Sequence, residues 1–582
     1  MVRRYPAIRP SRARRRATAL IGSAVIGVVA PEVRAQDSTQ AVTTCSGEQV
    51  TAIDIRPEPP RIVGRNAPWW RKLLFSVLLQ HRTTRPDVVR DYLRVKEGEP
   101  CREVERAETE RILRAQPFIA DATVRLEPDS TAGGSRLVVE TVDEVPTIIG
   151  ARISDGSLSG FKFGNANVMG RGRYMSAQWV DGFAHRDGVA LKYSDYHVLD
   201  GPNTFSVSLD RAPLYGDYSV ALARPFLTQL QSAAWHAGYR NASRYTRFLR
   251  PDTTAVSLRV RRQLFDLGGV YRVGNERSRV FVGALLTYER VDPDDEGKII
   301  SDAGITSDPD TAFRNRYDSF DETRGAFVVG VSSLRYLKVV GFDALEGVQD
   351  LGEGVQVAAV VDPGFVGSGG RFYSADVYGG TGSQNWFAGA RVEGEFRDPE
   401  DARSWSDAVL SGRAAWYIKP VERQVLVTEA EYTGAWRHRI PYELTLAARR
   451  GGQRGYKRSD VAGARRLIVR GEHRTSLGGM SRFTGFGVAG FTELGKTWAG
   501  EVPYGQDSDL KVSVGAGLLV AVPKQSRRLL RFDFAFPVTS EGREKWEFRF
   551  TVTKATSTFW REPGDIAQVR AGTPASNIFS WP

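Results

Sequence analysis

The sequence predicts a mainly β fold: a transmembrane antiparallel β-barrel of about sixteen strands, preceded by one small α/β domain. Three observations predict it. The N-terminus has the composition of an export signal. Residues 146–560 divide into short segments in which apolar and polar side chains alternate, separated by Gly, Asp, Asn and Pro. After the export signal, no run of about eighteen apolar residues occurs that could cross a membrane as a helix.

The first 35 residues have the three parts of a secretory signal peptide. A basic stretch ends at Arg16, an apolar run covers residues 17–30, and Val33-Arg34-Ala35 matches the pattern of a cleavage site. We therefore expect residues 1–35 to be removed after Ala35. Much of the formal net charge of +12 lies in this segment, so the remaining chain is only mildly basic and nucleic acid is not expected as a partner.

The chain contains two cysteines, Cys45 and Cys101. Export implies an oxidising compartment, where such a pair can close a loop of about 55 residues and stabilise a small domain by about 2–4 kcal/mol. We expect the two to form a disulfide. Two unpaired thiols are the alternative, because a sequence gives no distance between them.

Residues 36–145 predict a small α/β domain. Apolar and polar residues alternate where strands are expected, and Pro86 marks the first turn of a helix. The expected order is strand, helix, helix, strand and strand, at about residues 50–55, 84–96, 102–116, 122–126 and 137–142. A further apolar helical face at residues 69–79 is expected to pack on the sheet of this domain rather than on a membrane surface.

Some seventy residues of this domain resemble a polypeptide-transport-associated (POTRA) domain of bacterial surface-antigen proteins. The residues that carry the resemblance are Thr83-Thr84-Arg85, Val88-Val89-Arg90, Leu93, Glu97-Gly98, Glu108, Glu110-Arg111-Ile112-Leu113-Arg114, Phe118-Ile119 and Val124. The resemblance implies a periplasmic domain that binds unfolded polypeptide by adding it to a sheet edge. A spacer role is the alternative. We assign the substrate edge to the last strand, with Val138, Val139, Glu140, Thr141 and Val142.

The barrel prediction rests on the segments nearest the C-terminus. Residues 546–552 place Trp, Phe, Phe and Val on one face, and residues 530–536 place Leu and three Phe on one face with Arg and Asp on the other. A soluble β-sandwich alternates too. The number of segments, the charged second face and the aromatic residues at strand ends favour a closed membrane barrel. We expect an extracellular loop at residues 292–322 and a disordered C-terminal tail at residues 561–582.

One Gly-rich stretch carries the motif Gln453-Arg454-Gly455-Tyr456, followed by five candidate strands. It resembles the lid-loop motif of the superfamily that contains BamA, TamA and the two-partner-secretion transporters. Gln453 departs from the Val or Ile of that motif. The resemblance implies a loop that folds back into the lumen, with its arginine held by an acid on the second strand after the loop.

Glu493 is the acid at the matching position. The alternation of the strand places Glu493 on the same face as Gly487 and Ala489, and it places Phe486 and Val488 on the face towards lipid. The alternation and the resemblance therefore both point Glu493 into the lumen. Glu472 and Arg474 resemble the Glu-x-Arg of the strand just after the loop and are expected to line the same lumen.

These features predict a barrel in the bacterial outer membrane that assists insertion or translocation of polypeptides, with its POTRA-like domain in the periplasm. The expected partners are outer-membrane lipid, unfolded polypeptides and periplasmic accessory proteins. No cofactor or metal is expected, and no Gly-x-Ser-x-Gly, His-Glu-x-x-His or phosphate-binding loop indicates an enzyme. The alternatives are a passive porin or surface antigen and, more remotely, a lipolytic barrel. Insertase and secretion transporter are left open.

Overall fold

The computed structural model describes residues 44–570, apart from 61–81, 130–132, 155–156, 183–184, 200, 213, 252–254, 276–277, 302–303, 311, 314–315, 368–369, 399–405, 448–450, 457–460, 479–482, 540–544, 555–559 and 561. These residues belong to one compact unit that starts at Thr43. The predicted signal peptide and the predicted helix at residues 69–79 lie outside the described residues. Among the residues described, no helix is long and apolar enough to cross a membrane.

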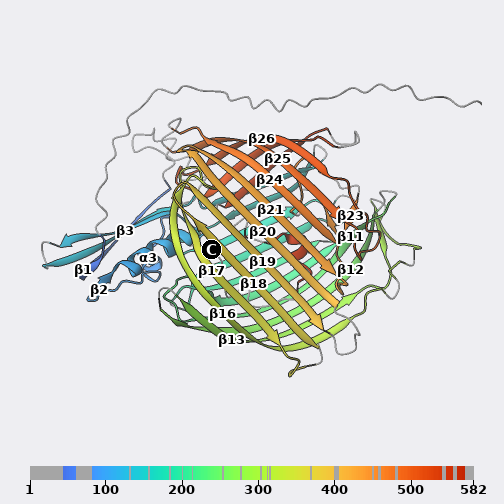
Figure 1. Cartoon of the computed structure of the whole chain (residues 1–582), viewed down its shortest axis with the longest axis horizontal. Helices are drawn as coiled ribbons and strands as arrows, with labels where there is room; N and C mark the ends of the chain where they lie inside the picture. Colours follow the sequence, from blue (N-terminus) through green and yellow to red (C-terminus); the bar gives the residue numbers. More distant parts are fainter. Residues whose placement is uncertain are drawn as a thin grey trace, which may run out of the picture. The chain divides into compact units, whose positions relative to one another are not determined.

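The N-terminal domain is a four-stranded sheet in the order β2-β1-β4-β3 with two helices (Figure 1). Its elements are β1 (Ser46–Glu58), α2 (Pro86–Arg90), β2 (Pro100–Arg102), α3 (Glu103–Ala115), β3 (Ile119–Asp129) and β4 (Gly134–Asp143). Apolar residues of both helices, among them Val89 and Ile112, are buried together with Val124 and Val139 of the sheet. The predicted order of elements is therefore present, with the short strand β2 added.

The assignment of residues 138–142 to a sheet edge is wrong. These residues belong to β4, which pairs parallel with β1 on one side and antiparallel with β3 on the other. The two helices between β1 and β3 lead the chain across the sheet, and β4 then inserts between the two earlier strands. The edge strand on that side is β3.

Cys45 and Cys101 form a disulfide, as the sequence predicts. Both are buried, and they join the residue before β1 to β2.

Replacing Cys45 with serine is expected to lower the free energy of unfolding of this domain by about 4 kcal/mol, the loop-closure value for cysteines 56 residues apart. Hydrogen exchange of the β1 and β4 amides in the full chain would measure the loss. The double variant Cys45→Ser/Cys101→Ser is the control, since it should lose no more than the single variant. A loss below about 1 kcal/mol would contradict the estimate.

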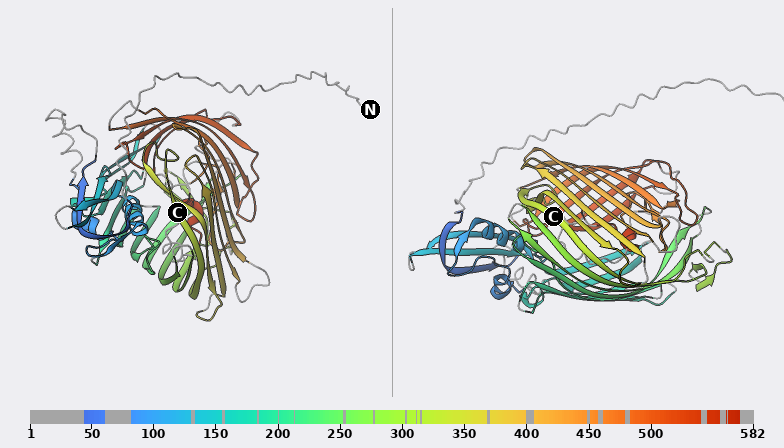
Figure 2. Two further views of the ribbon diagram at one scale, coloured as in Figure 1. Left: turned by 60° about the vertical axis from the view of Figure 1, so that its left-hand side comes forward. Right: turned by 60° about the horizontal axis from the view of Figure 1, so that its bottom comes forward.

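The second part is a closed antiparallel barrel that runs from β5 round to β28 (Figures 1 and 2). Its strands are β5 (Thr147–Ser154), β6 (Ser157–Asn165), β7 (Arg173–Val180), β8 (Gly188–Val198), β9 (Asn203–Ala212), β10 (Tyr215–Arg224), β11 (Ala233–Leu249), β12 (Ala255–Gly274), β13 (Arg279–Pro293), β14 (Lys298–Ser301), β15 (Gly304–Ser307), β16 (Phe320–Val340), β17 (Val348–Asp362), β18 (Arg371–Gly382), β19 (Trp386–Asp398), β20 (Ser406–Val421), β21 (Gln424–Trp436), β24 (Arg465–Ser476), β25 (Gly485–Trp498), β26 (Lys511–Ala521), β27 (Arg528–Pro537) and β28 (Glu547–Lys554). The smaller elements are the 3-10 turn η1 (Val168–Gly170), the strand pair β22 (Leu444–Thr445) and β23 (Ala462–Gly463), and the helix α4 (Gly564–Ala567).

The barrel has more strands than the expected number of about sixteen, because the described residues of this sheet form 22 strands. Two of these, β14 and β15, form a short hairpin between β13 and β16, which pair directly with each other. This hairpin lies in the stretch 292–322 that was expected to be loop. Strands β5 to β10 are short, and a short strand gives a weak alternation signal in the sequence.

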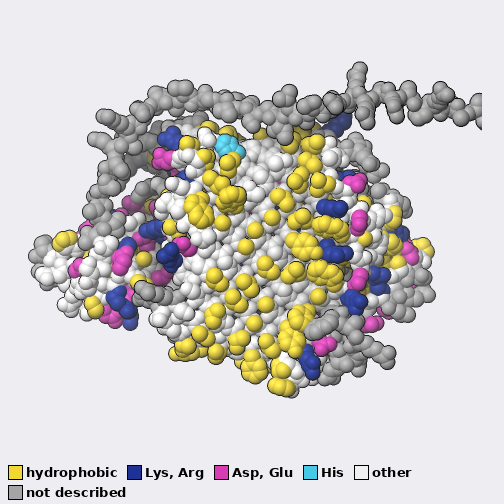
Figure 3. All heavy atoms as spheres, viewed as in Figure 1, with side chains coloured by type: hydrophobic (Ala, Val, Ile, Leu, Met, Phe, Trp, Pro, Cys, Tyr) yellow, Lys and Arg dark blue, Asp and Glu magenta, His cyan; other side chains and the backbone are white. Residues whose placement is uncertain are grey.

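The barrel wall is apolar outside and polar inside. On β27, Phe534 and Phe536 are exposed, whereas Arg531 and Asp533 are buried on the opposite face. Figure 3 shows hydrophobic side chains spread over the strands of one face, with charged ones gathered towards the strand ends. In water so large an apolar surface would drive association, and in lipid it is the expected surface of a transmembrane barrel. The alternation predicted for this strand is confirmed.

The expectation of a disordered C-terminal tail at residues 561–582 is also corrected. Residues 562–570 contain α4 and pack inside the barrel, with Ile566 and Val569 fully buried, so this part of the predicted disordered tail is ordered. Burial of these apolar side chains and pairing of Asp565 with Arg466 offset the entropy cost of ordering the segment. Residues 571–582 lie outside the described residues.

Candidate lid site in the barrel lumen

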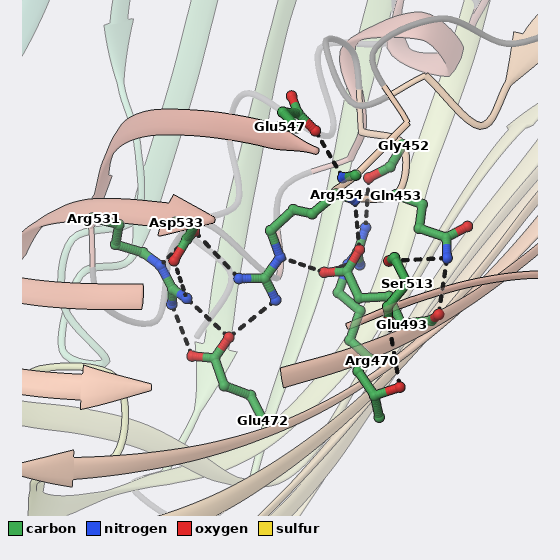
Figure 4. Close-up of polar contacts among 12 residues, drawn as sticks. Gly452, Gln453, Arg454, Arg470, Glu472, Glu493, Ser513, Arg531, Asp533 and Glu547 are labelled. Carbon is green, nitrogen blue, oxygen red and sulfur yellow. Dashed lines mark hydrogen bonds and ion pairs between the residues drawn. The ribbon is translucent and has the colours of Figure 1, made fainter. Parts of the chain in front are cut away.

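The motif Gln453-Arg454-Gly455-Tyr456 lies in the connection between β21 and β24, which turns back into the barrel. The backbone amide of Gln453 donates to Leu446 O at 3.0 Å, and this hydrogen bond closes the loop on itself. Gln453 is fully buried and Tyr456 nearly so. The loop therefore lies against the inner wall rather than in solvent (Figure 4).

Arg454 is held by acids from three strands of that wall. Its Nε lies 2.5 Å from Glu493 Oε1, and its backbone amide donates to Glu493 Oε2 at 2.7 Å. Nη2 lies 3.0 Å from Glu472 and Nη1 lies 3.3 Å from Asp533. The guanidinium also lies 3.5 Å over the ring of Phe491. Every polar edge of the guanidinium is thus met by a carboxylate, and its face is met by an aromatic ring.

Two further arginines balance Glu472, and Arg470 lies 3.7 Å from Glu493. Arg531 makes two contacts of 2.9 Å with the Glu472 carboxylate, and Arg474 Nε lies 2.5 Å from the same group. Arg474 continues to Asp343 at 3.0 Å. The network alternates in sign, so burial of each charge is compensated by its neighbours.

The other motif residues fix the loop through hydrogen bonds. Gln453 Nε2 donates to Glu493 O at 2.8 Å and to Ser513 Oγ at 3.2 Å. This explains how glutamine serves where the resembling motif has an apolar residue. The Tyr456 hydroxyl donates to Val512 O at 3.0 Å.

Gly455 occupies a position that only glycine accepts easily. Its φ is +92°, and an added Cβ would lie 3.2 Å from the Ser513 Cβ. Its amide donates to Glu547 Oε2 at 2.7 Å, so the first residue of β28 also holds the loop.

The structure therefore brings Gln453, Arg454, Gly455, Tyr456, Glu493, Glu472 and Arg474 into one network. Sequence reasoning missed Asp533, Arg531 and Glu547 as partners. The signal was present, because alternation on β27 places Arg531 and Asp533 on the inner face. The pattern says which face a residue lies on, but not which residue of another strand it meets.

The predicted edge residues 138–142 do not join this site, since they lie in the middle of the N-terminal sheet. On the edge strand β3, two carbonyls already accept hydrogen bonds from α3. Arg106 Nη1 donates to Val124 O at 2.6 Å, and Arg114 Nη1 donates to Ala122 O at 3.2 Å.

Helix α3 also docks the domain on the turn between β10 and β11. Glu108 Oε2 accepts from the Thr228 hydroxyl at 2.6 Å and from the Gln229 amide at 2.8 Å. Burial raises the pKa of Glu108, but Arg111 and these hydrogen bonds outweigh it and hold the pKa below its ordinary value of 4.5.

Acidification is therefore expected to weaken this docking. Because the Glu108 pKa is lower in the folded chain, its carboxylate stabilises the contact fully above about pH 4.5, and this contribution is lost as the pH falls through the folded-state pKa. Hydrogen exchange of the Gln229 amide, corrected for its intrinsic rate, would measure the loss. Glu108→Gln is the control, because it should remove the pH dependence. Protection that is unchanged below pH 4.5 would contradict the prediction.

The chain is similar to known proteins in structure rather than in sequence. No protein-family model and no curated protein matches the sequence. Among solved structures, BamA from Haemophilus ducreyi lacking POTRA domains 1–3 is similar with a TM-score of 0.39 and 11% identity, over 87% of this chain and 84% of that one. CdiB from Escherichia coli has a TM-score of 0.42 and 10% identity, over 90% and 91%. The siderophore receptor PirA from Pseudomonas aeruginosa has a TM-score of 0.35 and 10% identity, over 76% and 81%.

Proposed function

We propose that the protein is an outer-membrane barrel that assists the insertion or translocation of polypeptides, with the Arg454 loop as a lid that gates the lumen. The observation that carries the proposal is the attachment of Arg454 to Glu493, Glu472 and Asp533 inside the barrel. A loop held against the inner wall by ion pairs can be attached or released, which gives it two discrete states. A gate needs such states, whereas a constitutively open pore does not.

In this proposal the N-terminal domain binds unfolded polypeptide in the periplasm by strand addition. The candidate edge is β3, in place of the central strand β4. An incoming strand would compete with Arg106 and Arg114 for the carbonyls of Val124 and Ala122, and this competition makes binding reversible. The expected partners are outer-membrane lipid, unfolded polypeptides and periplasmic accessory proteins.

A photo-crosslinking residue at Glu127 on β3 tests the substrate edge in living cells. Glu140 on the central strand β4 is the matched control, since it carries the same side chain within the same sheet. The proposal expects polypeptide adducts from position 127 and few from position 140. Equal yields at both positions, or none at either, would argue against strand addition at β3.

A passive porin is the second candidate, and one observation favours it. The lumen contains a cavity of about 1200 Å³ with arginine, acidic and aromatic residues in its lining, among them Arg240, Arg244 and Tyr245. Conductance in planar bilayers separates the two functions. A large and steady conductance favours the porin. A small, fluctuating conductance that becomes larger when the lid is released favours the gated barrel.

A further inference from the structure

The segment that follows β28 lies within the ring of barrel strands, where the left-hand view of Figure 2 shows it in dark red. Trp560 and residues 562–570 belong to it, and we call these the C-terminal plug. Its buried side chains include Trp560, Ile566 and Val569. The indole of Trp560 meets the ring of Tyr378 edge-on at 5.5 Å, in a pocket that also includes Phe387.

The lumen binds this segment through its backbone as well as its side chains. The Trp560 carbonyl accepts from Arg391 Nη1 at 3.0 Å and from Arg413 Nη1 at 2.6 Å. On another part of the wall, Arg262 donates to Gln568 O at 2.6 Å and to Arg570 O at 2.5 Å. These three arginines, from β20, β19 and β12, recognise main-chain carbonyls, which every polypeptide carries.

Two side-chain features add selectivity. Asp565 accepts from Arg466 Nη1 at 2.6 Å, and Arg466 is itself almost fully buried. Trp560 fills a pocket in which Gly389 leaves room for the indole. A Cβ at position 389 would lie only 3.0 Å from the indole. The site therefore fits a polypeptide segment with a large aromatic residue followed, five positions later, by an acid that lies in a short helical turn.

The plug also reaches the lid. Pro563 lies against Gly451 of the lid loop, where a Cβ on the glycine would come within 2.7 Å of the proline. Arg466, which binds Asp565, also donates to Thr445 O at the base of the lid. The plug and the lid loop are thus in direct contact.

We propose that the lumen contains a binding site for a polypeptide segment, and that the C-terminal plug occupies it in cis as a displaceable stopper. The inference deepens the proposed function, on which its biological role rests, by naming where a polypeptide binds inside the barrel. A tethered occupant has an effective concentration of about millimolar, so a free peptide cannot compete until the plug is released.

The test uses a fluorescent synthetic peptide of residues 560–570 and purified protein in detergent. The full chain is compared with Trp560→Ala/Asp565→Ala, which removes two side-chain anchors of the plug and leaves the contacts of Arg570 with Glu393 and Glu395 in place. Anisotropy should show at least about tenfold tighter peptide binding to the variant, because its site is vacant for a larger fraction of the time. The same peptide with both alanine substitutions is the control and should bind neither protein.

Bilayer conductance gives the second readout. The variant should conduct several-fold more than the full chain, and the wild-type peptide should reduce its conductance again. Heat-modifiable migration reports whether the variant forms a barrel, and if it does not, Asp565→Asn alone provides the same comparison with little change in volume. Equal peptide binding to both proteins, or conductance that neither variant nor peptide alters, would overturn the proposal.

The experiments can contradict the plug inference and the proposed function independently. Peptide binding and conductance do not require insertion or translocation of a substrate. If the peptide binds as expected but a reconstituted barrel neither inserts nor transports unfolded polypeptide, the lumen site stands and the proposed function falls. If transport occurs and the peptide does not bind, the plug inference falls and the function stands.

Discussion

Arg454→Ala is expected to release the lid loop and to raise the conductance of the barrel. The change leaves Glu493 fully buried without its closest cation, and breaking a buried pair in this way typically costs about 3–5 kcal/mol. Glu472 retains Arg474 and Arg531, so the wall should keep its structure while the loop loses its ion pairs and keeps only hydrogen bonds such as those of Gln453. Conductance traces and the thermal midpoint of heat-modifiable migration would measure the two effects.

A double-mutant cycle with Glu493→Ala tests whether the two residues act together. The double variant should be barely worse than either single variant, because the second change removes a carboxylate whose closest cation the first had already removed. Arg371→Ala is the control, since this exposed arginine lies 3.7 Å from Asp398 and its loss should change stability by less than about 0.5 kcal/mol. Fully additive losses at 454 and 493 would count against a shared lock.

The contact between Arg454 and Glu493 could be predicted because the strand alternation and the loop motif both point to Glu493. Alternation along β25 places Glu493 on the inner face with Gly487 and Ala489, and the structure has all three buried there. The motif then supplies the partner in the loop. The disulfide was predicted for a similar reason, since export and a count of two cysteines leave one pairing.

The misplaced substrate edge has a different origin. Alternation shows that residues 138–142 form a strand, but sheet order depends on how the chain crosses between strands. The parallel pairing of β1 with β4 follows from the helices that connect the strands, and it places the last strand in the middle. No local pattern contains that information.

The C-terminal plug was missed because its composition is that of a loop. Gly564 and Pro563 suggest disorder, and the arginines that bind its carbonyls lie some 150 to 300 positions away in the sequence. An ordered segment with so little regular structure is held by its surroundings. Local propensity therefore gives the wrong expectation where tertiary contacts supply the order.

Glu289→Ala is expected to have the largest effect on the stability of the barrel itself. Glu289 is fully buried on β13, and three arginines converge on its carboxylate. Arg262 lies at 2.5 Å, Arg324 at 2.9 Å and Arg397 at 3.1 Å. Alanine would leave three neighbouring cations without their shared anion, so the loss should reach or exceed the 3–5 kcal/mol typical of one broken buried pair. Chemical unfolding followed by heat-modifiable migration would measure it.

Two controls separate charge from volume. Glu289→Gln keeps the shape and removes the charge, so it should lose nearly as much as alanine. Thr287→Ala removes a neutral partner of Arg324 from the same strand and should cost about 1 kcal/mol. A Glu289→Ala barrel as stable as the Thr287→Ala one would mean that the surrounding acids already neutralise the arginines.

The same substitution links the wall to the plug. Arg262 holds both Glu289 and the carbonyls of Gln568 and Arg570, so a change in its position should loosen the plug as well as the wall. Glu289→Ala should therefore raise the conductance without tightening peptide binding, because the peptide needs the same Arg262 contacts, whereas Arg454→Ala should release the lid and leave Arg262 in place. The plug and the lid can then be opened independently, and their separate conductances would show which of them closes the lumen.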